Sequence, residues 1–454
     1  MSAAASAPTG DRLLSVEEAR TAVLAAIQGP TPDEVVYLSE ARGRILAEDV
    51  ISLTALPPWD NSAMDGYAIR AADVAAASET APIRLQVIGE VRAGGAPETE
   101  LVRGAAIRIA TGAPLPKGAD AVVQVELTTP ATADGTPAGE RGRDATGPLP
   151  AAVLVHAAVG VGTAIRRAGD DLPEAAVILH ARTRVTPAAV ALAAGSGHET
   201  LRVHRRPRVA VLATGDEVRA AGRALGPAGI PDANGPGLMA LVDEAGGEPS
   251  TLGIAHDRLD DVRARIRAAE QGGVDAIIVS GGVSVGPYDV VRAAFAEIGR
   301  IELWRVAVQP GKPFAFGTVE RRDGGRTLLF GLPGNPVSTF VTFELFVRPA
   351  IRRLAGLPPD RLVRPTDHAI LLDAATKSPG RRAYLRVVAE RDGDGAPVRD
   401  DQGCVHVRLA GGASGQGSHV LSALALADAL AIVPETTDTL AAGSPVDLWW
   451  LDRD

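Results

Sequence analysis

Glycine-rich and polar segments follow hydrophobic runs in the second half of this chain, and their residue types suit the binding of a phosphate-like anion. "SGGVSVGPYD" (280–289) follows the run "VDAIIV", and "GLPGNPVS" (331–338) follows "TLLF". Their glycines permit close backbone approach and positive φ angles, while their serines offer hydroxyl groups. A helix beginning near Pro287 would point its positive end toward the same place. We therefore predict an oxyanion site formed by these loops.

Charged side chains accompany the glycines. Lys312, in "QPGKP", lies on a Pro/Gly loop from which its ammonium group could reach an anion. Several acids at the same rim could not all face phosphate unaided, so they suggest Mg²⁺ bridging carboxylates to phosphate oxygens. The rim acids are Asp216, Glu217, Asp257 and Asp289, of which Glu217, Asp257 and Asp289 are the predicted metal ligands. The predicted substrate-binding residues of the loops are Asp216, Gly281, Gly282, Ser284, Gly286, Lys312, Gly334, Asn335 and Ser338.

Each of these features has an ordinary alternative. A glycine-rich turn after a strand is commonly plain turn chemistry, the acids after the first strand could cap a helix, and Lys312 could be a solvated surface charge. Four such loops at one end of one sheet make an anion site the stronger interpretation.

The elements that must position these loops alternate between residues 207 and 355. Strand patterns such as "RVAVLATGDE" and "VDAIIVSGG" alternate with helix patterns such as "LDDVRARIRAAEQGG". This βαβ series predicts a three-layer α/β/α domain with a mostly parallel sheet. Ligands of such folds bind at the carboxyl ends of the strands, where the glycine-rich loops lie.

The rest of the chain predicts three further parts. Short β-rich pieces separated by Gly/Pro turns indicate a small inserted β domain at 56–150, in which 128–150 has the composition of a mobile surface excursion. Strand and helix patterns on either side predict a discontinuous linking domain of 13–55 and 151–206. Its N-terminal helix begins at a Ser15–Glu18 capping box and could instead pack on the α/β domain. Residues 356–454 predict a C-terminal β-barrel-like domain.

Composition excludes several other classes of protein. The formal net charge is −9 and there is no basic tract, which argues against nucleic acid and anionic membranes as partners. The single cysteine, Cys404, excludes an internal disulfide framework. We find no phosphate-binding GxxxxGK[ST] loop, dinucleotide GxGxxG or metal-ligand histidine spacing, and no evidence for a nucleophilic triad. With neither a secretory signal nor a membrane-spanning segment, we expect a cytoplasmic protein.

One polar stretch fits no regular element. "LPPWDNSAMDGYAIR" (56–70) places Trp59 beside several polar side chains without helical or strand periodicity. Trp59 and Met64 could simply pack, and Asn61 or Ser62 could cap a turn. The alternative is that the stretch lines a cleft.

The longer motifs resemble a known family. "WDNSAMDGYAIR", "RIATGAPLPKGADAVV", "RRAGDDL", "ATGDEV", "VSGGVSVGPYD", "VQPGKPFAFG", "GLPGNPVS" and "GQGSHVLSAL" occur in the order seen in MoeA-type molybdopterin molybdenumtransferases, relatives of the E domain of gephyrin. The resemblance spans about residues 13 to 450. It implies a four-domain, elongated homodimer that inserts molybdate into adenylated molybdopterin with Mg²⁺, releasing AMP and molybdenum cofactor.

The resemblance also implies site residues. The family's active-site positions fall on Asp60, Thr111, Asp171, Glu217, Asp257, Asp289, Arg386 and Ser418. Where some members have two lysines four apart before "PGKP", this chain has Arg305 and Gln309, so anion affinity would depend on Arg305, Lys312 and Arg386. In this family the cleft forms between subunits, and Asp60 would then serve a site whose other acids lie on the partner chain.

Two other functions remain open at the level of sequence. An adenylyltransferase acting one step earlier on molybdopterin uses a related α/β domain, but generally without the flanking domains predicted here. A non-catalytic dimeric scaffold, like the receptor-anchoring role of gephyrin, would have the same fold. The same fold would also allow contact with other cofactor-biosynthesis proteins. The acids at Asp60, Glu217, Asp257 and Asp289 argue against scaffolding alone.

Overall fold

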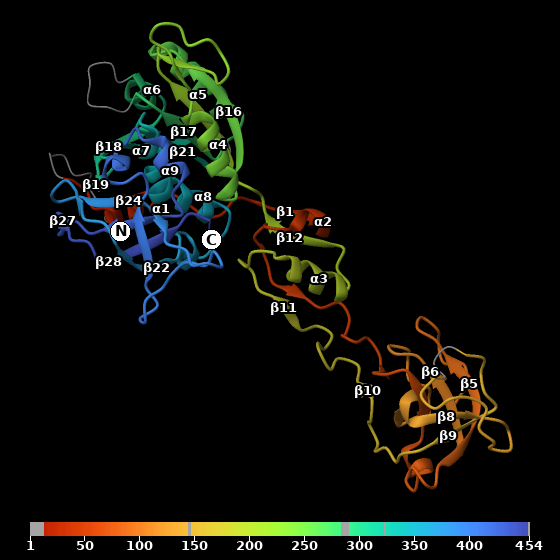
Figure 1. Ribbon diagram of the computed structural model, residues 1–454. Coiled ribbons are helices and arrows are strands. Elements are labelled where there is room, and N and C mark those ends of the chain that lie inside the picture. Colours follow the sequence, from red (N-terminus) through yellow and green to blue (C-terminus); the bar gives the residue numbers. More distant parts are fainter. Residues whose placement is uncertain (1–12, 144–146, 283–289, 322–323, 453–454) are drawn as a thin grey trace, which may run out of the picture.

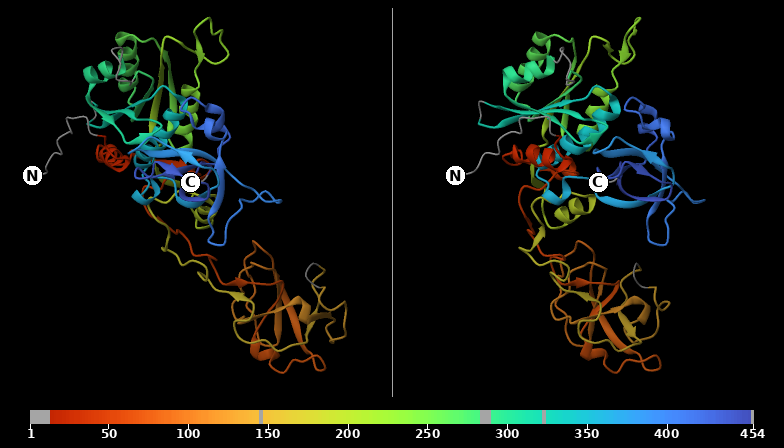
Figure 2. Two further views of the ribbon diagram at one scale, coloured as in Figure 1. Left: turned by 60° about the vertical axis from the view of Figure 1, so that its left-hand side comes forward. Right: turned by 90° about the vertical axis from the view of Figure 1, so that its left-hand side faces the viewer.

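The computed structural model describes residues 13–143, 147–282, 290–321 and 324–452. The chain is elongated, with the α/β and C-terminal domains packed together at one end and a small β domain at the other (Figures 1 and 2). A slender linking domain of two chain segments joins them. Within the described ranges, no helix is long and apolar enough to cross a membrane.

The α/β domain contains a six-stranded sheet in the order β16-β13-β17-β21-β20-β18, of which β20 runs antiparallel to both its neighbours. Its bounds are β13 Arg208–Thr214, β16 Glu248–Ala255, β17 Ala276–Ser280, β18 Arg300–Arg305, β20 Pro313–Glu320 and β21 Arg326–Leu332. Successive side chains of a strand face opposite sides, so each central strand contributes to two cores. The predicted mostly parallel sheet is confirmed.

Helices cover both faces of this sheet, which confirms the predicted three layers. One face packs against α1 (Val16–Ala25), α4 (Asn234–Glu244) and the helical segment that closes the domain. The other packs against α5 (Leu259–Gln271) and α6 (Val290–Ile298). The small paired strands β14 (Val218–Arg219) and β15 (Ile230–Pro231) lie between β13 and α4.

The closing helical segment has three parts: α7 Pro336–Thr342, a π-helical turn η3 Phe343–Val347, and α8 Arg348–Leu354. Helix α1 packs against it, and the predicted capping box is present, with Ser15 Oγ accepting from the Glu18 N–H and Glu18 Oε2 accepting from the Ser15 N–H. The N-terminal helix therefore belongs to the core of the α/β domain.

The two segments of the linking domain pair with each other through their strands. Strand β1 (Asp33–Tyr37) pairs antiparallel with β12 (Thr200–His204), and β2 (Val50–Ile51) with β11 (Val177–Leu179). Helices α2 (Leu38–Ala41) and α3 (Pro187–Gly195) pack on these strands. Two chain segments separated by the whole inserted domain thus share one core.

The inserted domain is a six-stranded sheet in the order β7-β4-β6-β5-β9-β8. Its strands are β4 Gly66–Ile69, β5 Ile83–Val91, β6 Ala105–Ile109, β7 Ala121–Gln124, β8 Thr128–Ala131 and β9 Ala152–Val155, with short helices η1 Ala71–Val74 and η2 Val125–Leu127. Strands β3 (Asn61–Ser62) and β10 (Ile165–Arg166) pair where the chain enters and leaves.

The expectation that 128–150 forms only a surface excursion was wrong at its start. Residues 128–131 form the buried strand β8, which pairs antiparallel with β9. Threonine suits a strand, and Pro130 is tolerated because β8 is at the edge of the sheet. Composition did not indicate strand β8, because the strand that pairs with it, β9, begins only at Ala152.

The C-terminal domain is a six-stranded sheet, β19-β24-β25-β22-β28-β26, that closes through an additional pairing of β24 with β26. Its strands are β22 Thr366–Leu371, β24 Arg382–Ala389, β25 Val405–Leu409, β26 Ala429–Val433 and β28 Ser444–Trp450, and its smaller elements are η4 Pro359–Arg361, β23 Ala375–Thr376, η5 Ala413–Gln416, α9 Leu421–Ala425 and β27 Thr439–Leu440. Strand β19 (Val308–Gln309) comes from the α/β domain and joins the two domains. The predicted barrel-like fold is confirmed.

Candidate active site

Three loops at the carboxyl ends of adjacent strands meet around Gly281. A Cβ atom at Gly281, whose φ is +100°, would lie 2.7 Å from both the carbonyl oxygen and Oγ1 of Thr214, which ends β13. A Cβ at Gly334, after β21, would lie 3.7 Å from the Gly281 Cα. A side chain at Gly281 would collide with Thr214, whereas one at Gly334 would make an ordinary contact, so Gly281 is the glycine that the meeting of these strand ends requires.

Asn234 fixes these loops to one another. It is the first residue of α4, and its Nδ2 donates to Ser280 Oγ at 2.7 Å and to the Gly334 carbonyl oxygen at 2.7 Å. Sequence reasoning did not single out this residue. The available signal was a polar residue in the "PDANGPG" segment (231–237), within which α4 begins.

The predicted rim acids after β13 and β16 lie close together. Asp216 Oδ1 is 3.2 Å from His256 Nδ1 and accepts from the Asp257 backbone N–H at 3.3 Å. The Glu217 carboxylate lies over Gly215, where a Cβ would be 2.8 Å from Glu217 Oε2. Burial, and then the negative charges of Asp216 and Glu217, raise the pKa of Asp257. These acids repel one another, which a bound cation would relieve.

The fit of this acid group to Mg²⁺ can be judged from its donors. Within the described ranges, no three His, Cys, Asp or Glu side chains are placed to hold a metal ion. Mg²⁺ usually takes only one or two carboxylates together with substrate phosphates, however, and prefers oxygen ligands. Glu217 and Asp257, with the raised pKa of Asp257, therefore fit a magnesium ion that the substrate helps to hold.

Three predicted residues of the loop after β17, namely Ser284, Gly286 and Asp289, lie outside the described residues. The described part of that loop includes Gly282, whose φ is +63° and where a Cβ would lie 2.7 Å from a methyl group of Val291. Gly282 is thus required by the packing of α6 against the loop.

The C-terminal domain contributes Ser418 and Arg386 to the same end of the sheet. Asn335, at the start of α7, donates from Nδ2 to Ser418 Oγ at 3.1 Å, and the Val337 N–H donates to the Ser418 carbonyl oxygen at 3.2 Å. Ser418 follows the loop that Arg386 holds: Arg386 Nη2 donates to the carbonyl oxygens of Gly415 and Gly417 at 2.7 and 3.1 Å.

Arg386 is a buried cation with spare hydrogen-bonding capacity. Its exposed fraction is 1%, and its Nε has no acceptor. Burial lowers the pKa of its guanidinium to about 10. A buried, incompletely bonded guanidinium is unfavourable unless an anion accompanies it, so Arg386 suits the binding of an oxyanion.

The remaining predicted residues of the α/β domain have mixed placements. Arg305 ends β18 with its side chain exposed, and Lys312 is half-buried on the loop before β20. Ser338 is buried in the first turn of α7, where its carbonyl oxygen accepts from Thr342 Oγ1. Gln309 Oε1 accepts from the Ser378 N–H at 2.8 Å, so this residue links two domains rather than facing the loops.

A second group of predicted residues lies in and beside the inserted domain. Asp60 accepts from Arg167 Nη1 at 2.6 Å and from the Ala168 N–H at 2.9 Å. The hydrogen bond from the Ala168 amide, followed by that from Arg167, lowers the pKa of Asp60. Asp171 is exposed nearby, and its backbone N–H donates to the Leu56 carbonyl oxygen at 3.0 Å.

Thr111 is oriented by a carboxylate that sequence reasoning did not assign a role. Asp65 Oδ1 accepts from both the Thr111 N–H, at 2.7 Å, and the Thr111 Oγ1, at 2.9 Å. Both residues lie in the quoted motifs of the first half, and their spacing of 46 residues gave no indication that they meet.

The stretch 56–70 is partly explained by turns. Asn61 Nδ2 donates to the Trp59 carbonyl oxygen, and Ser62 Oγ donates to that of Met64, as the turn interpretation predicted. The packing interpretation is wrong within one chain, because Trp59 is 49% exposed and Met64 is 40% exposed. The Asn61 Oδ1 is buried without a hydrogen-bond partner.

The structure of one chain does not bring the two groups together. The inserted domain that carries Asp60 and Thr111 lies at the far end of the linking domain from the α/β sheet (Figures 1 and 2). Strand β16, which Asp257 follows, and strand β24, which carries Arg386, lie at the other end. The two groups of predicted site residues are therefore separated within one chain.

Three family models cover nearly the whole chain. "MoeA N-terminal region (domain I and II)" matches residues 14–197, "Probable molybdopterin binding domain" matches 210–353, and "MoeA C-terminal region (domain IV)" matches 368–451.

Similar proteins agree with these matches. Molybdopterin molybdenumtransferase 2 of Mycobacterium tuberculosis is 36% identical over 418 residues, covering 89% of this chain and 92% of that protein. A molybdopterin molybdenumtransferase of Haemophilus influenzae is 33% identical over 436 residues, covering 96% and 98%. A crystal structure of a molybdopterin biosynthesis MoeA protein from Pyrococcus horikosii superposes with a TM-score of 0.75 at 30% identity, covering 97% and 99%.

Proposed function

Because the chain belongs to the MoeA family of molybdopterin molybdenumtransferases, we propose that it inserts molybdate into adenylated molybdopterin, releasing AMP and the molybdenum cofactor. The observation that carries the proposal is the convergence of three glycine-rich strand ends beside the acid group of Asp216, Glu217 and Asp257. Backbone amides and cations at such strand ends suit a pyrophosphate, and the acids suit the metal that accompanies it.

The roles of the chain's own residues follow from their chemistry. Loop amides around Gly281 and Gly334, with the Lys312 ammonium, neutralise the pyrophosphate charge of the substrate. Arg386 and Ser418 offer a guanidinium and a hydroxyl to molybdate, a dianion that must approach that charge. The two sulfurs that receive molybdenum belong to the substrate, so no cysteine is required of the protein.

Magnesium supplies electrostatic stabilisation of the phosphate oxygens when bound. We propose Glu217, Asp257 and Asp289 as the residues that hold it. Asp257 supports this assignment, since burial and then the neighbouring carboxylates raise its pKa, and a bound cation would lower that pKa.

We further propose that the active site is shared between the subunits of a homodimer in the cytoplasm. Asp60 and Thr111 belong to the inserted domain, which the linking domain separates from the α/β domain that carries Asp257 in the same chain (Figure 1). The exposed Trp59 and Met64 beside Asp60 support a surface that a second chain covers. Other cofactor-biosynthesis proteins are proposed as further contacts that deliver substrate or accept product.

The test of the reaction supplies purified protein with adenylated molybdopterin, Mg²⁺ and molybdate and follows AMP release. We expect release to depend on molybdate, and Asp257→Ala and Asp289→Ala to impair turnover in folded protein. AMP release independent of molybdate would refute the molybdate-insertion proposal, and wild-type rates in both variants would refute the acid assignment.

The test of the shared site mixes subunits. Asp60→Ala and Asp257→Ala homodimers are each expected to be inactive, but a heterodimer contains one site with both acids intact. With two independent sites, each heterodimer should have about one half of wild-type activity, and a random equimolar mixture about one quarter, because about half of its dimers are heterodimers. No recovery after subunit exchange has been verified by tagged co-purification would refute sharing.

A further inference from the structure

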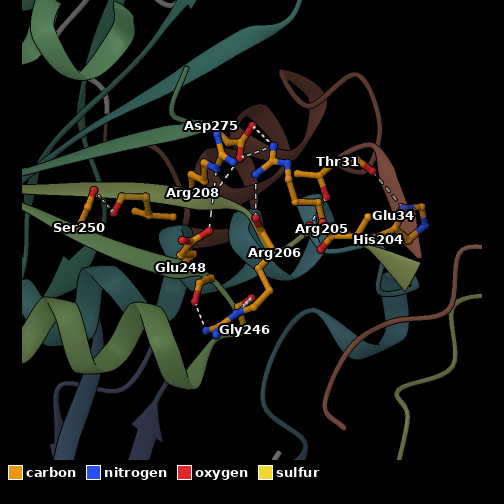
Figure 3. Close-up of polar contacts among 12 residues, drawn as sticks. Thr31, Glu34, His204, Arg205, Arg206, Arg208, Gly246, Glu248, Ser250 and Asp275 are labelled. Carbon is orange, nitrogen blue, oxygen red and sulfur yellow. Dashed lines mark hydrogen bonds and ion pairs between the residues drawn. The ribbon is translucent and has the colours of Figure 1, made fainter. Parts of the chain in front are cut away.

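A cavity outside the candidate active site lies where the linking domain meets the α/β domain. Its volume is about 350 Å³, within the range of small-ligand sites. Figure 3 shows the adjoining polar contacts, in which Arg206 points toward Gly246 at the end of α4. Its polar lining consists of Glu40, Arg42, Arg44, Arg184, His204, Arg206, Asp243, Glu244 and Arg352.

The lining has a surplus of positive charge. Five arginines face three acids, and two of those acids are already committed. Asp243 Oδ1 accepts from Arg206 Nη2 at 2.7 Å. Glu244 Oε1 accepts from Arg364 Nη2 at 2.6 Å and from Arg348 Nη1 at 3.1 Å. Glu40 is the one acid of the lining that remains for Arg42.

Two arginines of the linking domain retain donors. Arg44 Nη2 donates to Glu34 and, at 2.9 Å, to the His204 carbonyl oxygen, yet Arg44 Nε is buried without an acceptor. Arg42 is exposed at the cavity and, among the described residues, has no hydrogen-bond or ion-pair partner. A buried donor without an acceptor is uncommon in native proteins and calls for a physical explanation.

The ends of α4 and α8 also border the cavity, and their carbonyl groups could attract cations instead of an added anion. Those carbonyls are largely satisfied already. The Ala245, Gly246 and Gly247 N–H groups close the end of α4, and Arg206 binds the Gly247 carbonyl oxygen. Binding to the carbonyl groups at a helix end therefore explains the position of Arg206. It does not explain the positions of Arg42 or of the Arg44 Nε.

We propose that this cavity binds a compact, multiply charged oxyanion, such as a phosphorylated or polycarboxylated metabolite, through Arg42 and Arg44. Guanidinium groups bind phosphate and carboxylate by paired, charge-assisted hydrogen bonds. Among the described residues that line the cavity there are five arginines but no Phe, Tyr or Trp. The lining thus favours recognition of the anionic group over that of a base, and the ligand class proposed is a compact anion.

The site would connect two domains. Arg42 and Arg44 belong to the linking domain, whereas Asp243 and Arg352 belong to the α/β domain. An anion bound between these residues would add a contact between the linking domain and the α/β domain. The proposal does not depend on the reaction that the protein catalyses.

The test is isothermal titration of the full-length protein with inorganic phosphate, citrate and AMP, at constant ionic strength set with NaCl. We expect saturable binding of phosphate and citrate, with AMP no tighter than phosphate. Arg42→Gln and Arg44→Gln should each weaken phosphate binding by about tenfold or more, as expected for one charge-assisted hydrogen bond. Arg103→Gln, an exposed arginine of the inserted domain, is the matched control and should leave affinity unchanged.

Several outcomes would overturn the proposal. Absence of saturable binding, or equal affinity in wild type and Arg42→Gln, would exclude the site; Arg42 is exposed, so loss of folding should not obscure that result. Binding weakened by Lys312→Gln but not by Arg42→Gln would assign the anion to the candidate active site instead. Arg42-dependent binding of AMP tighter than phosphate would refute the compact-anion class.

Discussion

Asp275 is expected to form the main ion pairs between the linking domain and the α/β domain. It directly precedes β17, is 4% exposed, and accepts from Arg205 Nη2 at 3.0 and 2.9 Å and from Arg321 Nη1 at 3.2 Å (Figure 3). The Arg208 N–H donates to its Oδ2 at 2.7 Å. Asp275→Asn preserves the shape of the side chain but removes its charge.

The size of the expected loss of stability depends on how deeply the arginine partners of Asp275 are buried. The side chains of Arg205 and Arg321 are only 20% and 16% exposed, so neither can be fully hydrated when the carboxylate is lost. Removing one member of a buried ion pair costs about 3–5 kcal/mol. Because asparagine retains an acceptor oxygen, we expect a loss near the lower limit, about 3 kcal/mol, in the free energy of unfolding.

Urea unfolding followed by tryptophan fluorescence measures this loss, since Trp304 is buried in the same domain. The matched control is Glu320→Gln, which removes the surface pair of Glu320 with Arg326 across β20 and β21 and should cost below about 1 kcal/mol. If Asp275→Asn were no more destabilising than this control, the buried carboxylate would not form the main ion pairs and the reasoning would be refuted.

Three further predictions concern the candidate site. Arg167→Gln should raise the pKa of Asp60, whose present pKa is lowered, so the acid limb of the pH–rate profile should move to higher pH; an unmoved limb would contradict it. Gly281→Ala should impair the binding of adenylated molybdopterin in equilibrium titration, because its Cβ would press on Thr214 and its φ is +100°; wild-type affinity would contradict the loop geometry. Arg386→Lys should raise the KM for molybdate by about tenfold with unchanged circular dichroism, since lysine keeps the charge but loses the planar fork; an unchanged KM would remove Arg386 from the molybdate site.

Local signals predicted the individual elements well. The capping box at Ser15, the strand that ends at Thr214 and the helical segment that begins at Pro336 are all encoded by adjacent residues. Their periodicity, caps and glycines act within a few residues, so they can be recognised without a partner segment. The glycine-rich loops could likewise be placed at one end of the sheet.

Contacts between distant segments could not be recognised in this way. Asp65 meets Thr111, and Asn234 meets Gly334 across 100 residues. Gln309 was considered for its lost charge, yet its amide accepts a hydrogen bond from Ser378 in another domain. Such partners are selected by packing, which the spacing of residues in a chain does not reveal.

The sequence by itself determined the kind of elements, their order and the residue types available for anion chemistry, because these depend on short-range periodicity and local backbone preference. Only the tertiary structure showed that the inserted domain, with Asp60, and the α/β domain, with Asp257, lie at opposite ends of the elongated molecule. It also showed that the linking domain contacts the α/β domain at Asp275. These arrangements depend on which buried surfaces and charges satisfy one another across hundreds of residues. Which segments pack together therefore depends on the burial of surfaces and charges over the whole chain, and no single segment determines it.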